Sequence, residues 1–348
     1  MTVVFAILLF SFLIFIHEMG HFVAAKLSGV QVNEFAMFMG PAIVKWQRGE
    51  TQYSIRCIPF GGYCAMEGED EDTENPRSFQ KAAWWKRLII LVAGSAMNFI
   101  AGIILMAIVV SPAKKITEPV IAEAMPQCTI VREEGLQVGD RFLKVDDNRI
   151  YVASDVSMLL SLNPGETHDL VVERDGEKIV LDDYRMETCE VDGQRMYGIT
   201  FTQQEATFGN KLKFTWNNSI NTVRNVWLSL KMLVTGQAGL KDMTGPVGIV
   251  QIISDTAEAS ETKLDALMNT LYFGAFIAIN LAVMNMLPIP AVDGGRVFGL
   301  LITTGIEAVT KKKINPKYEG YIHGAGMILL LGLMAVIMFK DIIFIFKR

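Results

Sequence analysis

The segment HEMGH at residues 17–21 places two histidines and a glutamate in an otherwise apolar stretch. On a helix, residues four apart share one face, so His17 and His21 point the same way and can bind one metal ion. Zinc accepts imidazole nitrogens as ligands, and Glu18 can accept a proton from a water molecule at such a metal. The HExxH pattern therefore predicts zinc-dependent hydrolysis of peptide bonds.

A catalytic zinc site needs a third protein ligand and keeps one position for water. The two other histidines are His168, which we interpret as a surface residue, and His323, which we interpret as a residue of the membrane interface. Asp293 is the better candidate ligand, because it follows an apolar stretch that Pro288 and Pro290 interrupt. Prolines break a helix and free backbone groups that need polar partners. The alternative for the DGG segment is a simple turn that ends a helix.

The elements that must position these residues are apolar regions long enough to cross a bilayer, which takes about 20 residues as a helix. Hydrophobic residues make up 51% of the 348-residue chain, and four regions qualify: 2–26, 86–111, 268–303 and 324–346. The first region could instead be a cleaved signal peptide. It has no basic residue before Lys26 and no small-residue cleavage site, so we favour a retained span.

Basic residues cluster between the first two apolar regions and between the last two. The positive-inside rule assigns both connections to the cytoplasm and the segment between the second and third regions to the outside. His17 then lies about 22 Å along the first span, at 1.5 Å per residue. Asp293 also falls towards the cytoplasmic side, which places the candidate ligands at matching depth. Ionisable groups inside a membrane span are costly and indicate function.

We therefore predict a polytopic α-helical membrane protein with about four transmembrane helices, a membrane-associated β-hairpin region and an inserted extracytoplasmic α+β domain. The β region is predicted to contain three short strands, VNEFAMF, AIVKWQ and TQYSIRCI, separated by Gly-Pro and Arg-Gly-Glu turns and followed by an acidic loop. The predicted segments are a first transmembrane helix 1–27, the β region 28–83, a second helix 84–112, the inserted domain 113–206, an amphipathic interfacial segment 207–262, a broken third span 263–310, a basic cytoplasmic loop 311–322 and a fourth helix 323–348.

The inserted domain resembles a PDZ domain of the bacterial type. The match rests on GLQVGDRFLKVDDNRI, the later SDVSMLL helix and the hairpin ETHDLVVERDGEKIVL. The resemblance implies peptide binding by strand addition, although Asp147-Asn148 replaces the usual Asn-Gly turn and no loop for a peptide end is recognisable. Cys128 and Cys189 in this domain either pair in an oxidising compartment or remain two structural thiols.

Together the motifs resemble the site-2 protease family of intramembrane zinc metalloproteases. They are HEMGH, FGGYC, MNMLPIPAVDGG and TGPVGI, in that family's arrangement around a PDZ-like insert. The arrangement is most similar to the bacterial regulator-of-sigma-E protease branch, with a single PDZ module. The resemblance implies that His17, His21 and Asp293 bind the Zn2+ cofactor and that Glu18 is the general base.

The resemblance also implies substrate-binding residues on two segments beside the metal. These residues are Asn285, Pro288, Pro290, Gly61, Gly62 and Tyr63, the last three in a membrane re-entrant β-loop that presents the substrate as an added strand. The second span has GSAMNF where the family has GPxxNF. Asn98 is thus kept, whereas Ser95 replaces a proline. The resemblance therefore does not imply the helix bend that the family's proline produces at this position.

The expected substrates are single-span membrane proteins, such as anti-sigma factors or remnant signal peptides, cut after a first extracytoplasmic cleavage. The expected location is the bacterial inner membrane, with the active site towards the cytoplasm. The net charge of −5 suggests no nucleic-acid partner. A scaffold with a structural zinc site would have four protein ligands, and a metal transporter would distribute polar residues along several spans. Because Glu18 and an open fourth position are useful only to an enzyme, we favour the protease.

Overall fold

The computed structural model describes residues 2–69, 73–125, 128, 135–162, 167–186, 188–191, 194–239, 243, 245–311 and 317–346. It divides into two compact units, Met1–Met106 with Asn225–Arg348, and Ala107–Arg224. We call the first the membrane unit and the second the inserted unit. The predicted NPGE turn, the middle of the acidic loop, and Lys312 and Lys313 of the basic loop lie outside the described residues.

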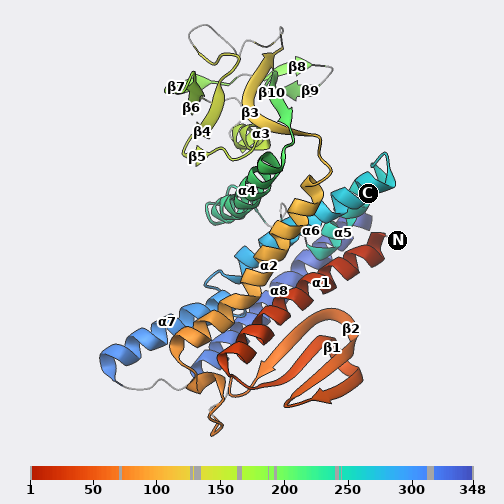
Figure 1. Ribbon diagram of the computed structural model, residues 1–348, viewed down its shortest axis with the longest axis vertical. Helices are drawn as coiled ribbons and strands as arrows, with labels where there is room; N and C mark the ends of the chain where they lie inside the picture. Colours follow the sequence, from red (N-terminus) through yellow and green to blue (C-terminus); the bar gives the residue numbers. More distant parts are fainter. Residues whose placement is uncertain are drawn as a thin grey trace. The chain divides into compact units, whose positions relative to one another are not determined.

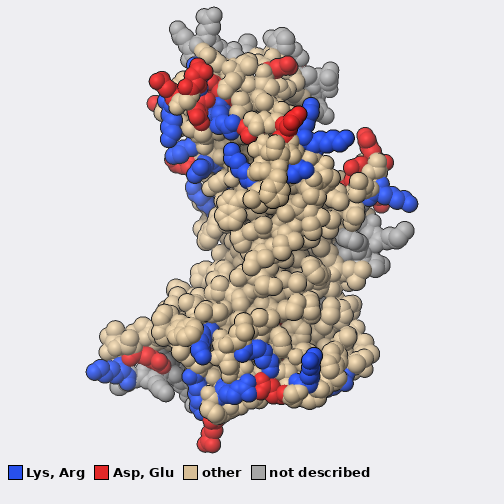
Figure 2. Space-filling view, viewed as in Figure 1, with Lys and Arg blue, Asp and Glu red and all other residues tan. Residues whose placement is uncertain are grey.

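Most of the membrane unit is helical (Figure 1). Its helices are α1 (Thr2–Ser28), η1 (Phe79–Lys81, a 3₁₀ helix), α2 (Trp84–Val110), α5 (Pro246–Glu258), α6 (Lys263–Asn285), α7 (Asp293–Thr310) and α8 (Lys317–Phe346). Four described stretches are long and apolar enough to cross a membrane, as predicted: Ile7–Ser28, Trp84–Val110, Lys263–Asn285 and Gly320–Asp341. Over these helices, Figure 2 shows a band without charged side chains beside a charged surface around the β region.

The third apolar region forms two helices. α6 ends at Asn285, and α7 begins at Asp293. The connection contains Pro288 and Pro290, which have no backbone N–H to continue a helix. Asp293 is consequently the first residue of α7, where the unpaired N–H groups and the helix dipole favour a carboxylate.

The β region forms two long strands, β1 (Val32–Arg48) and β2 (Thr51–Met66), and the prediction of three short strands was wrong. The predicted Gly-Pro turn lies inside β1, with Gly40 at a φ of +84°. Both strands fold back on themselves. Residues 34–37 pair with both 52–55 and 62–65, and residues 44–48 pair with 51–55. Among the described residues, 62–66 therefore form an outer row with a strand partner on one side.

Aromatic side chains fix this β region against α1. Phe35 of β1 contacts Phe15 and Phe22, with ring centroids 5.9 and 5.2 Å apart. Phe22 also contacts Tyr53 of β2, 6.0 Å away. Because Phe15 and Phe22 flank HEMGH in the sequence, this packing holds the β region beside the ionisable residues of α1.

The inserted unit is built on one antiparallel sheet with strand order β10-β3-β4-β6-β7, and β5 pairs with β4. Its elements are β3 (Lys115–Ala124), β4 (Arg141–Val145), β5 (Asn148–Arg149), α3 (Ala153–Leu162), β6 (Thr167–Arg174), β7 (Glu177–Arg185), a separate ribbon of β8 (Cys189–Val191) and β9 (Gln194–Met196), and β10 (Ile199–Glu205). α4 (Phe208–Val234) contributes its residues up to Arg224. The predicted Asp-Gly hairpin is present, with Asp175 and Gly176 at φ values of +53° and +85°.

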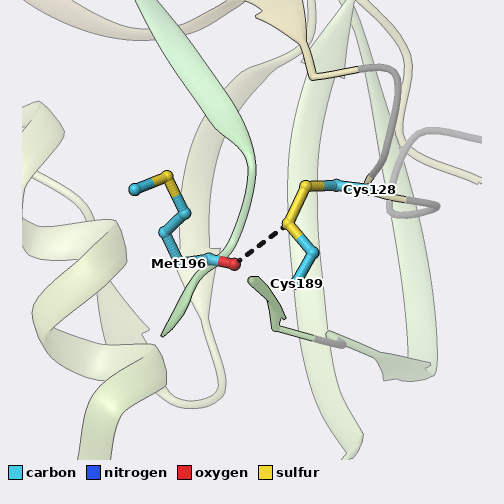
Figure 3. The surroundings of a disulfide bond; sticks show 3 residues. All are labelled: Cys128, Cys189 and Met196. Carbon is cyan, nitrogen blue, oxygen red and sulfur yellow. Dashed lines mark hydrogen bonds between the residues drawn. A yellow bond between two sulfur atoms is a disulfide. The ribbon is translucent and has the colours of Figure 1, made fainter. Parts of the chain in front are cut away.

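Cys128 and Cys189 form a disulfide bond within the inserted unit (Figure 3). The bond ties the segment after β3 to β8, whose Cys189 Sγ also lies 3.4 Å from the carbonyl oxygen of Met196. Cys57 and Cys64 of the membrane unit are free thiols. Of the two alternatives for the first pair of cysteines, the structure thus has the disulfide.

The interpretation of His168 as a surface residue was wrong. His168 is 2% exposed and shares the inward side of β6 with Leu170 and Val172. Side chains two apart on a strand point to the same face, so the alternation of His168 with these apolar residues already indicated burial.

Candidate metal centre

Three side chains from two helices meet at one point in the membrane unit. Nε2 of His17 and Nε2 of His21 lie 3.2 and 3.3 Å from Oδ2 of Asp293, and 3.3 Å from each other. The i, i+4 spacing on α1 aligns the two imidazoles, and the helix break brings Asp293 to them. Among the described residues, this is the one group of three or more potential ligands within such a distance.

These distances fit a zinc ion. Ligand atoms about 2.0–2.1 Å from a tetrahedral zinc lie about 3.3 Å apart along each edge of the tetrahedron. Oδ2 of Asp293 is buried and accepts no hydrogen bond with acceptable geometry, although two ring nitrogens lie within 3.3 Å of it. Three electron-pair donors aimed at one another in an apolar unit repel unless a cation lies among them. The residues therefore fit zinc with three ligands and one open position.

The second ring nitrogen of His21 has a partner that determines its tautomer. Nδ1 of His21 lies 2.8 Å from the carbonyl oxygen of Ile90 in α2, so Nδ1 carries the proton and donates it to this bond. The lone pair of Nε2 is then free to bind a metal, an arrangement common at metal-binding histidines. Gly94 makes the approach of α2 possible, because a Cβ at this position would lie 2.8 Å from Cε1 of His17 and would overlap His21.

His17 has a corresponding neighbour in Asn98. The amide nitrogen of Asn98 lies 3.3 Å from Nδ1 of His17, and Oδ1 of Asn98 is buried without a partner. The two orientations of an amide occupy nearly the same space. With Oδ1 facing His17, Asn98 accepts a hydrogen bond from the Nδ1–H of His17, its own oxygen gains a partner, and Nε2 of His17 is free for a metal.

Glu18 lies between the two histidines in the chain and faces the outer row of the β region. A Cβ on Gly62 would lie 3.4 Å from Cγ of Glu18 and 3.4 Å from Ile14 of the same helix. The start of the outer row thus passes directly beside the candidate base. Gly61 precedes it at a φ of +81°, a conformation that favours glycine.

The other predicted substrate-binding residues lie on the same two segments. Tyr63 is in the outer row, paired with Ala36. Asn285 is the last residue of α6 and is half-buried, whereas Pro288 in the connection is exposed. An ion pair between Arg296 of α7 and Glu69, which follows β2, links the helix that begins with Asp293 to the end of the β region.

Sequence reasoning missed the supporting contacts of this centre, which are Ile90, Gly94, Glu69 and Arg296. The backbone oxygen of Ile90 has no sequence signal at all. Gly94 stands four residues before Asn98 in the GSAMNF segment, and this spacing of a small and a polar residue was the available signal.

A profile of peptidase family M50 matches residues 5–333. The chain belongs to peptidase family M50. Three relatives align with nearly the whole chain. A Clostridium perfringens protein described as a zinc metalloprotease is 36% identical over 346 residues, with 99% of each chain covered. Zinc metalloprotease RasP of Oceanobacillus iheyensis is 28% identical and the regulator of sigma-W protease RasP of Bacillus subtilis 25%, each with 98% of both chains covered.

M50 membership establishes the general activity and the cofactor. This M50 chain is a zinc metalloprotease, as HEMGH predicted, and its resemblance to the site-2 protease family is confirmed. The four helices in its described part that are long and apolar enough to cross a membrane are consistent with a membrane protein.

Proposed function

We propose that this M50 peptidase hydrolyses peptide bonds within the transmembrane segments of single-span membrane proteins, after a first extracytoplasmic cleavage. Anti-sigma-factor-like proteins and remnant signal peptides are the proposed substrates. The observation that carries the proposal is the convergence of His17, His21 and Asp293 on helices of a membrane unit, beside an outer row of β-strand. A soluble peptide would not require a site among membrane-spanning helices.

His17, His21 and Asp293 are the proposed zinc ligands. Zinc, when bound, supplies Lewis acidity that polarises a carbonyl group and lowers the pKa of water. Glu18 takes the proton from the attacking water and then gives it to the amine that leaves, so that one carboxylate serves both halves of the hydrolysis. The position of Glu18 beside Gly62 brings this proton transfer next to the path of the substrate.

The outer row 62–66 is the proposed substrate-docking edge. A transmembrane helix must unwind before a protease can reach its backbone, and the unwound segment loses its internal hydrogen bonds. An open strand edge offers N–H and C=O groups that replace them. Gly61 leads into this edge, and Gly62 and Tyr63 begin it. Asn285, Pro288 and Pro290, the other proposed substrate-binding residues, lie at the end of α6 and in the connection that leads to Asp293.

The inserted unit is proposed to lie outside the cytoplasm and to act as a PDZ-like domain, as in the regulator-of-sigma-E branch. Its disulfide supports this side, because such bonds persist in oxidising compartments. The free thiols of Cys57 and Cys64 fit a cytoplasmic β region. The proposed location is thus the bacterial inner membrane, with the active site towards the cytoplasm.

A cleavage assay tests the proposal. The purified full-length protein in detergent is incubated with a model single-span substrate, and bound zinc is measured in parallel. We expect Glu18→Gln to lower cleavage by about 10³-fold or more while zinc is retained, because only the proton acceptor is lost. Glu67→Gln, at a partly exposed acid that directly follows β2 and bonds to Asn33, is the matched control and keeps full cleavage. Full cleavage by Glu18→Gln would overturn the general-base assignment.

The same assay separates the enzyme from a scaffold with a structural zinc site. A structural site is closed by four protein ligands, and its function would not depend on Glu18. In the described part of the chain, three side chains converge on the proposed metal position. Loss of cleavage with retained zinc in Glu18→Gln therefore supports the enzyme and contradicts the scaffold.

A further inference from the structure

We infer that His323 and Gly326 of α8 form a clamp that holds the connection between α6 and α7 in the conformation that delivers Asp293 to the two histidines. The clamp is not part of the ligand set. It is a positioning device supplied by the last helix, and it rests on the proposed role of Asp293 as a zinc ligand.

The connection contains a residue in an unfavourable backbone conformation. Ala291, two residues before Asp293, has a φ of +86°, a region that side chains other than glycine rarely adopt. A residue keeps such a conformation only when the surrounding structure stabilises it, and strained backbone conformations are common at functional sites. An external contact is therefore needed at Ala291.

His323 supplies that contact. The backbone N–H of Ala291 donates a hydrogen bond to Nδ1 of His323, with the two nitrogens 3.1 Å apart. His323 is half-buried near the start of the apolar stretch Gly320–Asp341 of α8. A polar side chain in such a helix is costly without a function, and here it gives an acceptor to the amide of the strained residue.

Gly326 provides the second half of the clamp. A Cβ at this position would lie 2.7 Å from the carbonyl carbon of Pro290 and 2.8 Å from its oxygen, which is closer than real atoms approach. Residues three apart share a helix face, so His323 and Gly326 contact consecutive residues of the connection, Ala291 and Pro290. The absence of a side chain at Gly326 lets α8 approach closely enough for the histidine to reach.

Only Val292 separates Ala291, which the clamp contacts, from Asp293, the proposed zinc ligand. The N–H of Gly295 donates a hydrogen bond to the carbonyl oxygen of Val292, with nitrogen and oxygen 3.0 Å apart. Asp293 therefore lies within a hydrogen-bonded turn at the start of α7. A change at Ala291 therefore moves Asp293 as well. Displacing a catalytic group by about 1 Å can cost about 10²-fold in rate, so a clamp two residues away has a measurable influence.

The test uses four variants of the full-length protein in detergent. His323→Leu removes the acceptor, whereas His323→Asn places an amide oxygen where Nδ1 was. Gly326→Ala forces α8 away from Pro290. Tyr321→Leu, at a 73% exposed position of the same helix, is the matched control. The measurements are zinc release to a chelator, and kcat and KM for a single-span substrate.

We expect His323→Leu and Gly326→Ala to speed zinc release by about 10- to 100-fold, the range for lost support of metal ligands. We expect kcat to fall with little change in KM, and His323→Asn and Tyr321→Leu to remain within about 3-fold of wild type. Adding Ala291→Gly to His323→Leu should recover part of the loss, because glycine adopts a positive φ without strain. A merely structural loss would not be rescued in this way.

Three results would overturn the clamp: wild-type zinc release and kcat in His323→Leu, equal losses in the leucine and asparagine variants, or no rescue by Ala291→Gly. Asp293→Asn distinguishes this failure from failure of the proposed function. If Asp293→Asn loses zinc while His323→Leu does not, only the clamp is wrong. If Asp293→Asn keeps zinc, the ligand assignment itself is wrong.

Discussion

Each unit of the molecule contains a close contact between histidine and aspartate, and the two contacts differ in what surrounds them. In the membrane unit, His17 and His21 both approach one oxygen of Asp293. In the inserted unit, Nδ1 of His168 lies 3.1 Å from Oδ2 of Asp146, and Nε2 of His168 is buried without a partner. In the first contact three possible metal-binding atoms converge, two imidazole nitrogens and one carboxylate oxygen. In the second contact there are only two, one nitrogen and one oxygen.

The difference follows from the secondary structure that carries each histidine. A helix brings residues four apart to one face, so HEMGH supplies two imidazoles to one point. On β6, the residues that share the face of His168 are Leu170 and Val172, which offer no ligand atoms. The other oxygen of Asp146 accepts a hydrogen bond from the N–H of Asp169, so this pair stabilises a turn. A histidine–aspartate contact alone therefore does not indicate a metal site.

The largest expected effect is the difference between two variants, each of which removes the charge of one of the two aspartates. Asp293→Asn should lower zinc affinity by more than about 100-fold and abolish cleavage, because losing a ligand costs more than losing its support. Asp146→Asn should leave both unchanged. Zinc content after dialysis against a chelator, together with the cleavage assay, checks both variants. Loss of zinc in Asp146→Asn would contradict the distinction between the two contacts.

A smaller effect is expected at Asn98, which lies beside Nδ1 of His17 and is not one of the proposed ligands. Asn98→Ala should weaken zinc binding by about 10- to 100-fold, since His17 would lose the acceptor for its Nδ1 proton. Ser95→Ala is the matched control, because Ser95 is equally buried on α2 and its hydroxyl has no hydrogen-bond partner. Competition with a calibrated zinc chelator measures both. Equal affinities in the two variants would remove Asn98 from the site.

The same contrast explains what could be predicted from the sequence. Local patterns were sufficient for the four apolar helices, for the shared face of His17 and His21, and for the helix break before Asp293. His168 was misread although its alternation with Leu170 and Val172 pointed to burial. The two strands predicted on either side of Gly40 and Pro41 are joined in β1, which folds back on itself there, so that residues 34–37 and 44–47 both pair with 52–55. Their common partner lies further along the chain, so residue types alone did not show that they form one strand.

The supporting contacts could not be predicted, because they join residues far apart in the chain. Ile90 and His21 are 69 residues apart, and Ala291 and His323 are 32 apart. In each case one partner is a backbone group, which every residue possesses. Nothing in the residue types shows which carbonyl or amide is used until the helices are packed.

The inserted unit should respond to loss of its disulfide without any response in the metal centre. Changing both Cys128 and Cys189 to Ser should destabilise this unit by about 2–4 kcal/mol, the usual value for a cross-link closing a long loop. Faster proteolysis of residues 107–224 would report the change. Zinc affinity should equal that of wild type. A change in zinc affinity would show that the two units are energetically coupled.

The smallest expected effect concerns a carboxylate that binds no metal and holds the outer row. Although burial raises the pKa of Glu34, hydrogen bonds from Ser54 and Arg56 outweigh it and lower that pKa to about 2. Oε1 of Glu34 accepts from both groups at 2.7 Å, and the Tyr63 hydroxyl of the outer row also bonds to this carboxylate.

Because the pKa of Glu34 is lower in the folded protein than the usual 4.5, the ionised carboxylate stabilises the β region above pH 4.5. This contribution is lost as the pH falls from 4.5 towards 2. After allowance for screening at a partly exposed site, we expect about 1 kcal/mol. The difference in unfolding midpoint between wild type and Glu34→Gln should thus be constant above pH 5 and shrink below pH 4.5. A difference that stays constant down to pH 3 would mean that the network does not depend on this charge, in contrast to the metal centre.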